Sequence, residues 1–309
     1  MKIAMMGSGG VGGFFGGRLA HAGYDVSFVA RGKHLEAMRR HGLTIESEAQ
    51  GNIRIPRVRA TDNPASLGPV DLVILSVKLW DTEDAARAIA PIVGPETGVL
   101  SLQNGVVKDD ILRAAFGPER VMGGVGYVAT HISRPGVIHQ VGTMQRIVFG
   151  EYDGRKSARA DFLHEALLKA GVKAELSDDV RRAIWEKYVF LVGLSGTTAA
   201  TRMPLGPIRG NPRSRAFLLD MMREVVAVGR AMGVALAEDF ADDRLAFGDT
   251  LPADMTSSMH HDLERGNRLE VDWLSGGVVD MGAKVGVPAP ANRAVQALLA
   301  VHAQGRASK

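Results

Sequence analysis

The chain has 309 residues, which is enough for two domains with hydrophobic cores of their own. Its 37 basic and 34 acidic side chains leave a net charge of only +3, so we expect no nucleic-acid partner. There is no cysteine, which excludes disulfides and thiolate chemistry, and no apolar stretch reaches the roughly 20 residues of a membrane span. Because the first residues begin a strand instead of a signal peptide, we expect a cytoplasmic protein.

Residues 1–31 carry the pattern of a dinucleotide-binding turn. An apolar run at residues 2–6 is followed by glycine-rich sequence, a helical pattern and a second apolar run at residues 26–30. In this context the first glycine allows a tight turn, the second lets a pyrophosphate approach the backbone, and the third lets the helix lie close to the sheet. The helix N-terminus adds N–H groups and a positive dipole end. The predicted cofactor-binding residues are Gly7, Ser8, Gly9, Gly10, Val11 and Gly12.

The end of the second strand indicates which dinucleotide binds. Chains that bind NAD usually place an acid about 20 residues after the glycines, where it holds the ribose 2′-hydroxyl. Here the segment reads Val29-Ala30-Arg31-Gly32-Lys33 and contains no acid. Arg31 can form a bidentate pair with a 2′-phosphate and Lys33 can add a charge, although both could also be solvated surface cations. The missing acid favours NADPH over NADH.

Two further buried strands end in polar residues. The near-continuous apolar runs at 71–77 and 98–102 are typical of strands covered on both faces, and a helix is expected between them at 82–92. Lys78 follows the first run and Asn104 follows the second. Ligands of open α/β sheets bind outside the carboxyl ends of the strands, so we expect both side chains near the glycine turn. A solvated loop lysine and a turn asparagine before Gly105 are the competing interpretations.

The alternation of strand and helix ends near Ser177. Strands are expected at 121–130 and 137–150, whereas helical patterns follow at 178–193, 213–232, 239–247, 256–265, 271–284 and 292–303. We therefore predict an α/β fold with a Rossmann-type NADP-binding domain at residues 1–178 and an all-helical substrate and catalytic domain at residues 179–309. Exposed helix faces would allow a homodimer to form. No helix pairs histidines at metal-binding spacing, so we expect no metal site.

The helix that opens the second domain carries Lys187. Ser177 is the expected cap of this helix, and no charge follows Lys187 before Arg202, so the segment should be largely buried. Burial disfavours the charged form of a lysine and lets it release a proton at neutral pH. A carbonyl reductase needs such a donor, because hydride arrives at the carbon while an acid protonates the oxygen. The competing interpretation is that Lys187 pairs with an acid or extends to water.

Several motifs together resemble the ketopantoate reductases (2-dehydropantoate 2-reductases). The glycine turn, Lys78, the Gln103-Asn104-Gly105 segment, Lys187 within W-E-K, the T-S-S-M block at 256–259 and L-E-V-D at 269–272 occur in that family's order and approximate spacing. The resemblance covers nearly the whole chain. It implies NADPH-dependent reduction of 2-dehydropantoate, a 2-keto acid, to (R)-pantoate, a step of pantothenate biosynthesis.

The resemblance also implies a role for each matching side chain. Lys187 would donate the proton to the keto oxygen, and Glu270 would hold the substrate hydroxyl and assist the lysine. Ser258, twelve residues before Glu270, would bind the substrate carboxylate, and Asn104 would orient substrate and nicotinamide. Lys78, Asn104 and Glu270 are accordingly expected at the cofactor as well.

Two positions depart from the family pattern. Asparagines commonly stand four and eight residues after the lysine, where this chain has Leu191 and Ser195. Leu191 cannot form a hydrogen bond, and Ser195, the expected substrate-binding residue there, is shorter, so selection for a substrate hydroxyl should weaken. A branched or aromatic 2-keto acid therefore competes as the substrate. A hydroxy-acid or opine dehydrogenase and a non-catalytic NADPH sensor also compete as functions, and the retained Lys187 and Glu270 argue against the sensor.

Overall fold

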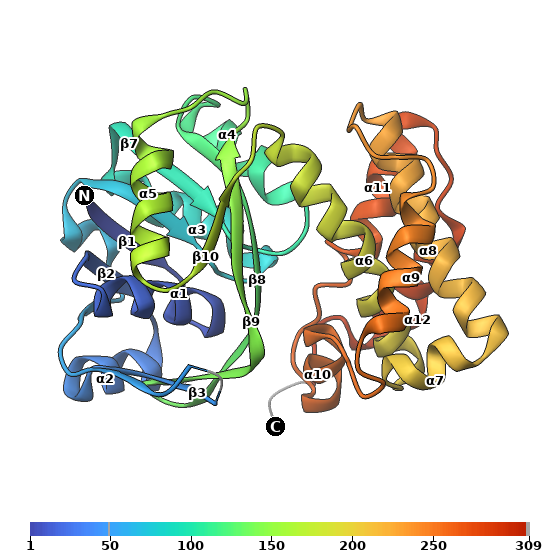
Figure 1. Cartoon of the computed structure of the whole chain (residues 1–309), viewed down its shortest axis with the longest axis horizontal. Coiled ribbons are helices and arrows are strands. Elements are labelled where there is room, and N and C mark those ends of the chain that lie inside the picture. The colour runs from blue at the N-terminus through green and yellow to red at the C-terminus, as the bar shows by residue number, and fades with distance from the viewer. Residues whose placement is uncertain (49, 307–309) are drawn as a thin grey trace. The chain divides into compact units, whose positions relative to one another are not determined.

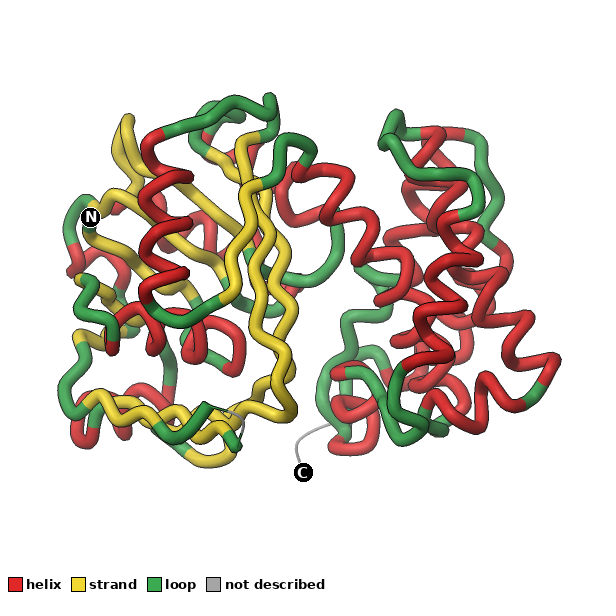
Figure 2. Tube along the Cα trace, in the orientation of Figure 1, coloured by secondary structure: helices red, strands yellow, loops and turns green. Residues whose placement is uncertain are grey.

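The computed structural model describes residues 1–48 and 50–306, and the chain divides into two compact units (Figure 1). Unit 1 comprises residues 1–104 and 108–183, and unit 2 comprises residues 105–107 and the chain from residue 184 onward. In the described residues every strand belongs to unit 1, whereas the elements of unit 2 are helices (Figure 2). The predicted fold class, an α/β part followed by a helical part, is confirmed.

The strands of unit 1 form a mixed sheet. Within the described residues it has ten strands in the order β4-β3-β9-β8-β7-β6-β1-β2-β5, with β10 also paired to β9. The strands are β1 (Lys2–Met6), β2 (Asp25–Val29), β3 (Leu43–Ser47), β4 (Ile53–Ile55), β5 (Arg59–Thr61), β6 (Val70–Leu75), β7 (Val93–Ser101), β8 (Val121–Arg134), β9 (Val137–Glu151) and β10 (Lys173–Leu176). The run β8-β7-β6-β1-β2-β5 is parallel, whereas β8 and β9 form a long antiparallel hairpin.

Parallel pairing aligns the carboxyl ends of the three central strands. Met6 at the end of β1 is in register with Val29 of β2 on one side and with Leu75 of β6 on the other. The segments that leave these strands, which carry the glycine turn, Arg31 and Lys78, therefore start at one edge of the sheet. In doubly wound folds this edge is where ligands bind.

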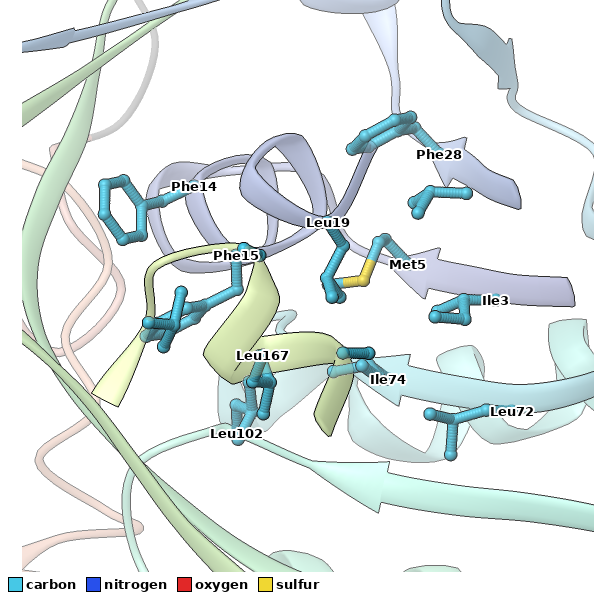
Figure 3. Close-up of a cluster of buried hydrophobic side chains, with 14 of the residues drawn as sticks. Ile3, Met5, Phe14, Phe15, Leu19, Phe28, Leu72, Ile74, Leu102 and Leu167 are labelled. Carbon is cyan, nitrogen blue, oxygen red and sulfur yellow. The ribbon is translucent and has the colours of Figure 1, made fainter. Parts of the chain in front are cut away.

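Helix α1 (Gly10–His21) is packed closely on this sheet. Phe14 and Phe15 are completely buried and meet edge to face, with their ring centroids 5.3 Å apart (Figure 3). A Cβ on Gly16 would lie only 2.6 Å from Cγ of Met5 in β1. The helix glycines therefore allow an approach to the sheet that larger residues would prevent, and the buried aromatic surface offsets their low helix propensity.

The other helices of unit 1 connect the strands. They are α2 (Gly32–His41), α3 (Thr82–Ile89), α4 (Val107–Phe116) and α5 (Ala158–Lys169), with the short 3₁₀ turns η1 (Pro64–Leu67), η2 (Leu79–Asp81) and η3 (Ala90–Ile92). α5 and β10 occupy residues 158–176, a stretch in which the sequence pattern predicts no element. The hydroxyl of Ser157 caps α5 by accepting from the Ala160 N–H at 3.2 Å.

A buried ion pair lies at the start of α4. Nζ of Lys108, which is completely buried, lies 2.9 Å from Oδ2 of Asp109 and donates to the carbonyl oxygens of Ser101 and Gly124 at 3.3 and 3.2 Å. The Tyr152 hydroxyl donates to the same Asp109 oxygen at 2.7 Å. The pair therefore fixes the end of β7, and with it the segment leading to Asn104, to β8.

The helices of unit 2 differ from the predicted ranges at several ends. They are α6 (Val180–Thr201), whose residues 180–183 still belong to unit 1, α7 (Leu205–Gly210), α8 (Pro212–Ala231), α9 (Phe240–Thr250), α10 (Ser258–Arg265), α11 (Ser275–Val285), α12 (Pro290–Leu299) and the 3₁₀ turn η4 (Ala300–His302). α6 continues eight residues beyond its expected end at 193. α11 begins after its expected start at 271, because residues 271–274 form a turn.

The start of α6 is not capped as the sequence suggested. The prediction that Ser177 caps this helix is wrong, since its hydroxyl accepts from the Asp179 N–H at 3.2 Å, before the helix begins. Asp179 provides the cap instead, with Oδ1 accepting from the Arg182 N–H at 3.0 Å. Serine and aspartate are both good helix caps. Because the Ser177 hydroxyl closes a tight turn with the Asp179 N–H, it does not bind the first N–H groups of the helix.

Helices α8 and α12 are joined by the half-buried carboxylate of Glu224. The Glu224 side chain accepts from the backbone N–H groups of Ala291 and Asn292 at 2.7 and 2.9 Å, and from the Asn292 side chain at 2.7 Å. A carboxylate at a helix N-terminus satisfies its unpaired N–H groups and interacts favourably with its dipole. No helix within the described residues is both long and apolar enough to cross a bilayer.

Candidate active site

The glycine turn between β1 and α1 is tied to the end of β2. The N–H groups of Gly7 and Ser8 both donate to the carbonyl oxygen of Val29, at 3.2 and 3.1 Å, and the buried Ser8 hydroxyl donates to the same oxygen at 3.0 Å. Gly7 has a φ of 92°, a conformation that L side chains rarely adopt. The turn therefore has a fixed conformation and position before any ligand binds.

The glycines of the turn differ in their surroundings. A Cβ on Gly12 would lie 2.1 Å from the Gly7 carbonyl oxygen, and a Cβ on Gly10 would lie 2.5 Å from that of Thr130 in β8. In contrast, apart from Gly9 itself and its two chain neighbours, no atom of the described residues lies within 4 Å of a Cβ built on Gly9. Protein atoms pack against Gly10 and Gly12, whereas the space at Gly9 is open to a ligand.

The beginning of α1 has the charge distribution that an anion requires. Gly9 is its N-cap residue, and within the described chain no side chain caps the helix and no acid occurs in its first turn. The positive end of the helix dipole is therefore not neutralised by an acid of the first turn. The unpaired N–H groups there, among them that of the half-buried Val11, are not capped by a side chain. The open space and these donors fit the pyrophosphate of a dinucleotide.

Arg31 follows β2 and has a partner that the sequence did not reveal. Its side chain is 80% exposed, and Nη2 lies 2.9 Å from Oδ2 of Asp81, whose side chain is 27% exposed. Asp81 ends η2, the turn after β6, and is separated from Arg31 by 50 positions. An acid therefore does lie beside the predicted 2′-phosphate site. It belongs to the turn after β6, whereas the acid of NAD-binding chains stands at the end of the second strand.

Lys78 and Asn104 belong to segments joined by Gln103. The amide nitrogen of Gln103 donates to the Thr82 hydroxyl at 2.8 Å and to the Lys78 carbonyl oxygen at 3.4 Å, and its amide oxygen accepts from the Ser101 hydroxyl at 3.0 Å. Gln103 is buried, whereas Lys78 and Asn104 on either side of this network are half-buried. The ammonium of Lys78 lies 5.7 Å from the ring centroid of Trp80.

His34 supports the glycine turn and was not among the predicted residues. Its Nδ1 accepts from the Gly136 N–H at 3.0 Å, so the proton resides on Nε2, which lies 3.0 Å from the Ser8 carbonyl oxygen and donates to it. Burial lowers the pKa of His34, and the Ser8 hydrogen bond opposes this shift only in part. A histidine three residues after an exposed arginine carries no sequence signal of this role, because both of its partners are backbone atoms.

In unit 2, Lys187 is half-buried on α6 beside the fully buried Tyr188. The Tyr188 hydroxyl donates to the Leu274 carbonyl oxygen at 2.7 Å and lies 3.3 Å from that of Trp273. These carbonyls belong to the turn that begins at Glu270, which is only 6% exposed and whose carbonyl oxygen accepts from the Leu274 N–H at 2.9 Å. Burial raises the pKa of Tyr188, which keeps the hydroxyl protonated as a donor. Tyr188 thus connects the helix of Lys187 to the turn of Glu270.

The two serines of the T-S-S-M block have different environments. Ser257 is buried and caps α10 by accepting from the His260 N–H at 3.0 Å. Its hydroxyl also lies 2.9 Å from that of Thr198 in α6, and His260 Nδ1 lies 2.8 Å from the Thr198 carbonyl oxygen. Ser258, in contrast, is exposed. Ser257 therefore holds α10 on α6, and Ser258 is the serine accessible to a ligand.

Leu191 and Ser195 follow Lys187 on the same face of α6, one and two turns later. Leu191 is half-buried, and Ser195 is 1% exposed. The Ser195 hydroxyl has no hydrogen-bond partner among the described residues. A buried hydroxyl without a partner costs free energy until water or a ligand forms a hydrogen bond with it. The substrate-binding role of Ser195 stays a prediction.

Within each unit, the structure thus connects the residues that the sequence singled out. In unit 1, His34, Asp81 and Gln103 link the segments of the glycine turn, Arg31, Lys78 and Asn104. In unit 2, Tyr188 and Thr198 link the segments of Lys187, Glu270 and Ser258. In the described part of the chain no three acidic or histidine side chains are grouped as metal ligands would be.

An open glycine turn on a largely parallel sheet, followed by a helical unit with a half-buried lysine, defines a dinucleotide-dependent oxidoreductase. Residues 3–154 match the family described as ketopantoate reductase PanE/ApbA, and residues 179–303 match its C-terminal family, ketopantoate reductase PanE/ApbA C terminal. The chain therefore belongs to the ketopantoate reductase family, which confirms the resemblance and the oxidoreductase class. Members of this family bind NAD(P)H.

Known proteins resemble the chain over almost its full length. It is 35% identical to a 2-dehydropantoate 2-reductase of Mesorhizobium japonicum, and the match covers 97% of each chain. The crystal structure of a PanE/ApbA family ketopantoate reductase from Ralstonia eutropha is 36% identical, with a TM-score of 0.89 over 98% of both chains. A D-mandelate dehydrogenase solved with NADH and anilino(oxo)acetate has the same fold, with a TM-score of 0.89 over 98% of both chains, at 22% identity.

Proposed function

We propose that the protein reduces 2-dehydropantoate to (R)-pantoate with NADPH, a step of pantothenate biosynthesis in the cytoplasm. The observation that carries the proposal is the hydrogen bond from Tyr188 to Leu274, which links the helix of Lys187 to the turn of Glu270 in a chain of this family. Reduction of a keto group requires a proton donor beside a hydride source, and a carboxylate near a lysine donor favours its protonated form before turnover.

NADPH would supply the hydride, and unit 1 has residues that fit it. The open space at Gly9 and the uncapped start of α1 suit the pyrophosphate. The exposed guanidinium of Arg31 suits the 2′-phosphate, and Lys78 adds positive charge at the same edge of the sheet. Asn104, after β7, would orient the nicotinamide and the substrate.

In the proposed reaction the hydride goes to the keto carbon, and Lys187 gives a proton from Nζ to the keto oxygen. Glu270 would hold the substrate hydroxyl, interact with the cofactor and assist Lys187. The exposed Ser258 would bind the substrate carboxylate. The products are then the hydroxy acid, oxidised nicotinamide and a neutral lysine that regains its proton from solvent.

A second candidate is the reduction of a different 2-keto acid. Leu191 presents an apolar side chain one turn after Lys187, at a position where the family commonly has an asparagine, and Ser195 is almost fully buried. An apolar wall favours a branched or aromatic substituent over one that carries a hydroxyl. The fold is also that of a D-mandelate dehydrogenase, so architecture alone does not select the acid.

The test is to mix the purified protein with NADPH and 2-dehydropantoate and to follow the loss of nicotinamide absorbance. Lys187→Ala should lower kcat by about 10²-fold or more while leaving NADPH affinity unchanged. Lys284→Ala is the matched control, because Lys284 is an exposed lysine of α11 in the same unit. It should retain full activity.

The competing functions give different results in this assay. Faster, Lys187-dependent turnover of a branched or aromatic 2-keto acid would establish the second candidate. NADPH binding without consumption of any 2-keto acid would contradict both and favour a sensor. Sedimentation of the same preparation would show whether the protein is the homodimer that its exposed helix faces allow.

A further inference from the structure

The ion pair between Arg31 and Asp81 lies where the two dinucleotides differ. We propose that Asp81 is a selectivity residue that moderates the preference for NADPH over NADH. Its carboxylate competes with a 2′-phosphate for the Arg31 guanidinium, and it offers an acceptor to a ribose 2′-hydroxyl. The inference rests on the proposed assignment of Arg31 to the 2′-phosphate and extends it to the other nucleotide.

The fold places Asp81 on one side of the glycine turn and Arg31 on the other. The sheet order β6-β1-β2 puts the glycine turn, which follows β1, between the segments after β6 and β2. Asp81 belongs to the first of these segments and Arg31 to the second. The Nη2–Oδ2 distance of 2.9 Å therefore joins two elements that are adjacent only in the folded chain.

Asp81 is held on a fixed turn. Its N–H donates to the Lys78 carbonyl oxygen at 2.9 Å, and the Thr82 hydroxyl donates to the Leu79 carbonyl oxygen at 2.7 Å. The buried amide of Gln103 donates to that same hydroxyl at 2.8 Å. The carboxylate is therefore presented in a defined place, unlike a surface acid on a mobile loop.

The ion pair between Arg31 and Asp81 is too exposed to contribute much to the stability of the fold. With 80% of the Arg31 side chain exposed, water screens the interaction, and ion pairs of this kind contribute little to folding. The Asp81 contact occupies one Nη2 hydrogen, and a guanidinium has five donors in a planar fork. The remaining edge can meet a phosphate while the acid stays beside it.

The two dinucleotides respond to this acid in opposite ways. A 2′-phosphate carries close to two negative charges, so the Asp81 carboxylate repels it and takes part of the Arg31 charge. A ribose 2′-hydroxyl, in contrast, is held well by a carboxylate acceptor, as in chains that bind NAD. Removing the negative charge of Asp81 should therefore strengthen NADPH binding and weaken NADH binding, and both changes raise the ratio of the two affinities.

The experiment measures the Kd of NADPH and of NADH by fluorescence titration, without any keto acid, for the wild type and Asp81→Asn. We expect the affinity ratio of NADPH to NADH to rise about tenfold in the variant, equivalent to about 1.4 kcal/mol. Asp84→Asn is the matched control, because it removes the same charge one turn further on, where Asp84 pairs with Arg87. Its ratio should stay at the wild-type value.

An unchanged or lower ratio in Asp81→Asn would overturn the inference. A lower ratio would mean that the acid orients Arg31 for the phosphate instead of competing with it. Arg31→Ala tests the underlying NADPH assignment separately, because it should weaken NADPH far more than NADH. If it weakens both equally, or if the wild type prefers NADH, the NADPH assignment fails whatever Asp81→Asn does.

Discussion

The hydroxyl groups of Thr198 and Ser257 lie 2.9 Å apart and join the second half of α6 to the first turn of α10. The same Ser257 hydroxyl caps α10 through the His260 N–H. The adjacent Ser258 is thereby placed at the start of a helix whose position is fixed on α6. A structural serine and an accessible one thus stand side by side in the sequence.

The two serines should give separable effects on mutation. Ser257→Ala removes the cap and the link to Thr198, so we expect a loss of about 1–2 kcal/mol in the free energy of unfolding. Ser258→Ala should leave this free energy within about 0.5 kcal/mol of wild type but raise KM for the keto acid. Urea denaturation and steady-state kinetics on both variants check this. A stable Ser258→Ala protein with unchanged KM would remove Ser258 from the site.

The glycine turn allows a similar comparison between Gly9 and Gly12. Beyond its two chain neighbours, a Cβ on Gly9 meets no described atom within 4 Å, so Gly9→Ala should fold with nearly wild-type stability and lose at least about tenfold in nucleotide affinity. A Cβ on Gly12 would lie 2.1 Å from the Gly7 carbonyl oxygen, so Gly12→Ala should lose about 1–3 kcal/mol of stability as well. Denaturation and nucleotide titration distinguish the two. Wild-type affinity in Gly9→Ala would contradict a pyrophosphate at this turn.

His34 predicts a pH dependence of stability. Because burial lowers the pKa of His34 below its ordinary value of 6.5, the unfolded chain takes up a proton first as the pH falls. The stabilisation is therefore complete above about pH 6.5 and is lost as the pH falls through the folded-state pKa. Protonated Nδ1 could no longer accept from the Gly136 N–H.

The measurement is the free energy of unfolding at about pH 7.5 and about pH 5.5 for the wild type and His34→Ala. The decrease on acidification should be smaller in the variant, because one group with a lowered pKa has been removed. His21→Ala, in the last turn of α1, provides a histidine control. An equal decrease in wild type and His34→Ala would refute the assignment.

The buried pair of Lys108 and Asp109 should be strongly coupled. Lys108→Met leaves the Asp109 carboxylate buried without its cation, and breaking such a pair costs about 3–5 kcal/mol. Adding Asp109→Asn should restore part of this loss, since the uncompensated charge is then gone. Thermal and urea unfolding of the single and double variants measure the coupling. The exposed Lys173 of β10 is the control, and Lys173→Met should change stability by less than about 0.5 kcal/mol.

The sequence predicts those features that depend on local residue patterns. The glycine turn at Gly7 to Gly12 and the strand ends before Lys78 and Asn104 follow from periodicity and from the geometry of parallel sheets. Asp81 could not be predicted as the partner of Arg31, because the two residues are 50 positions apart in the sequence and meet only because β6, β1 and β2 are neighbours in the folded sheet. The absence of an acid directly after β2 therefore does not exclude an acid beside Arg31, because Asp81 reaches it from the segment after β6.

The same limit applies to unit 2. Ser177 and Asp179 are both capping residues, and their order along a tight turn decides which one acts. The choice between Ser257 and Ser258 depends on which hydroxyl faces Thr198, and the role of Tyr188 depends on carbonyls 85 and 86 residues away. Long-range hydrogen bonds to backbone atoms have no residue-type signature, so such positioning residues emerge only from the fold.

The contact between Gly10 and Thr130 limits how a nucleotide can arrive. Because the β8 strand passes within 2.5 Å of the place where a Gly10 side chain would begin, one flank of the phosphate turn is closed by protein. The side of the turn at Gly9 stays open, and a nucleotide would approach from there. Natural variants that shorten or lengthen the β8–β9 hairpin would therefore reshape the nucleotide entrance while their glycine signature stayed intact.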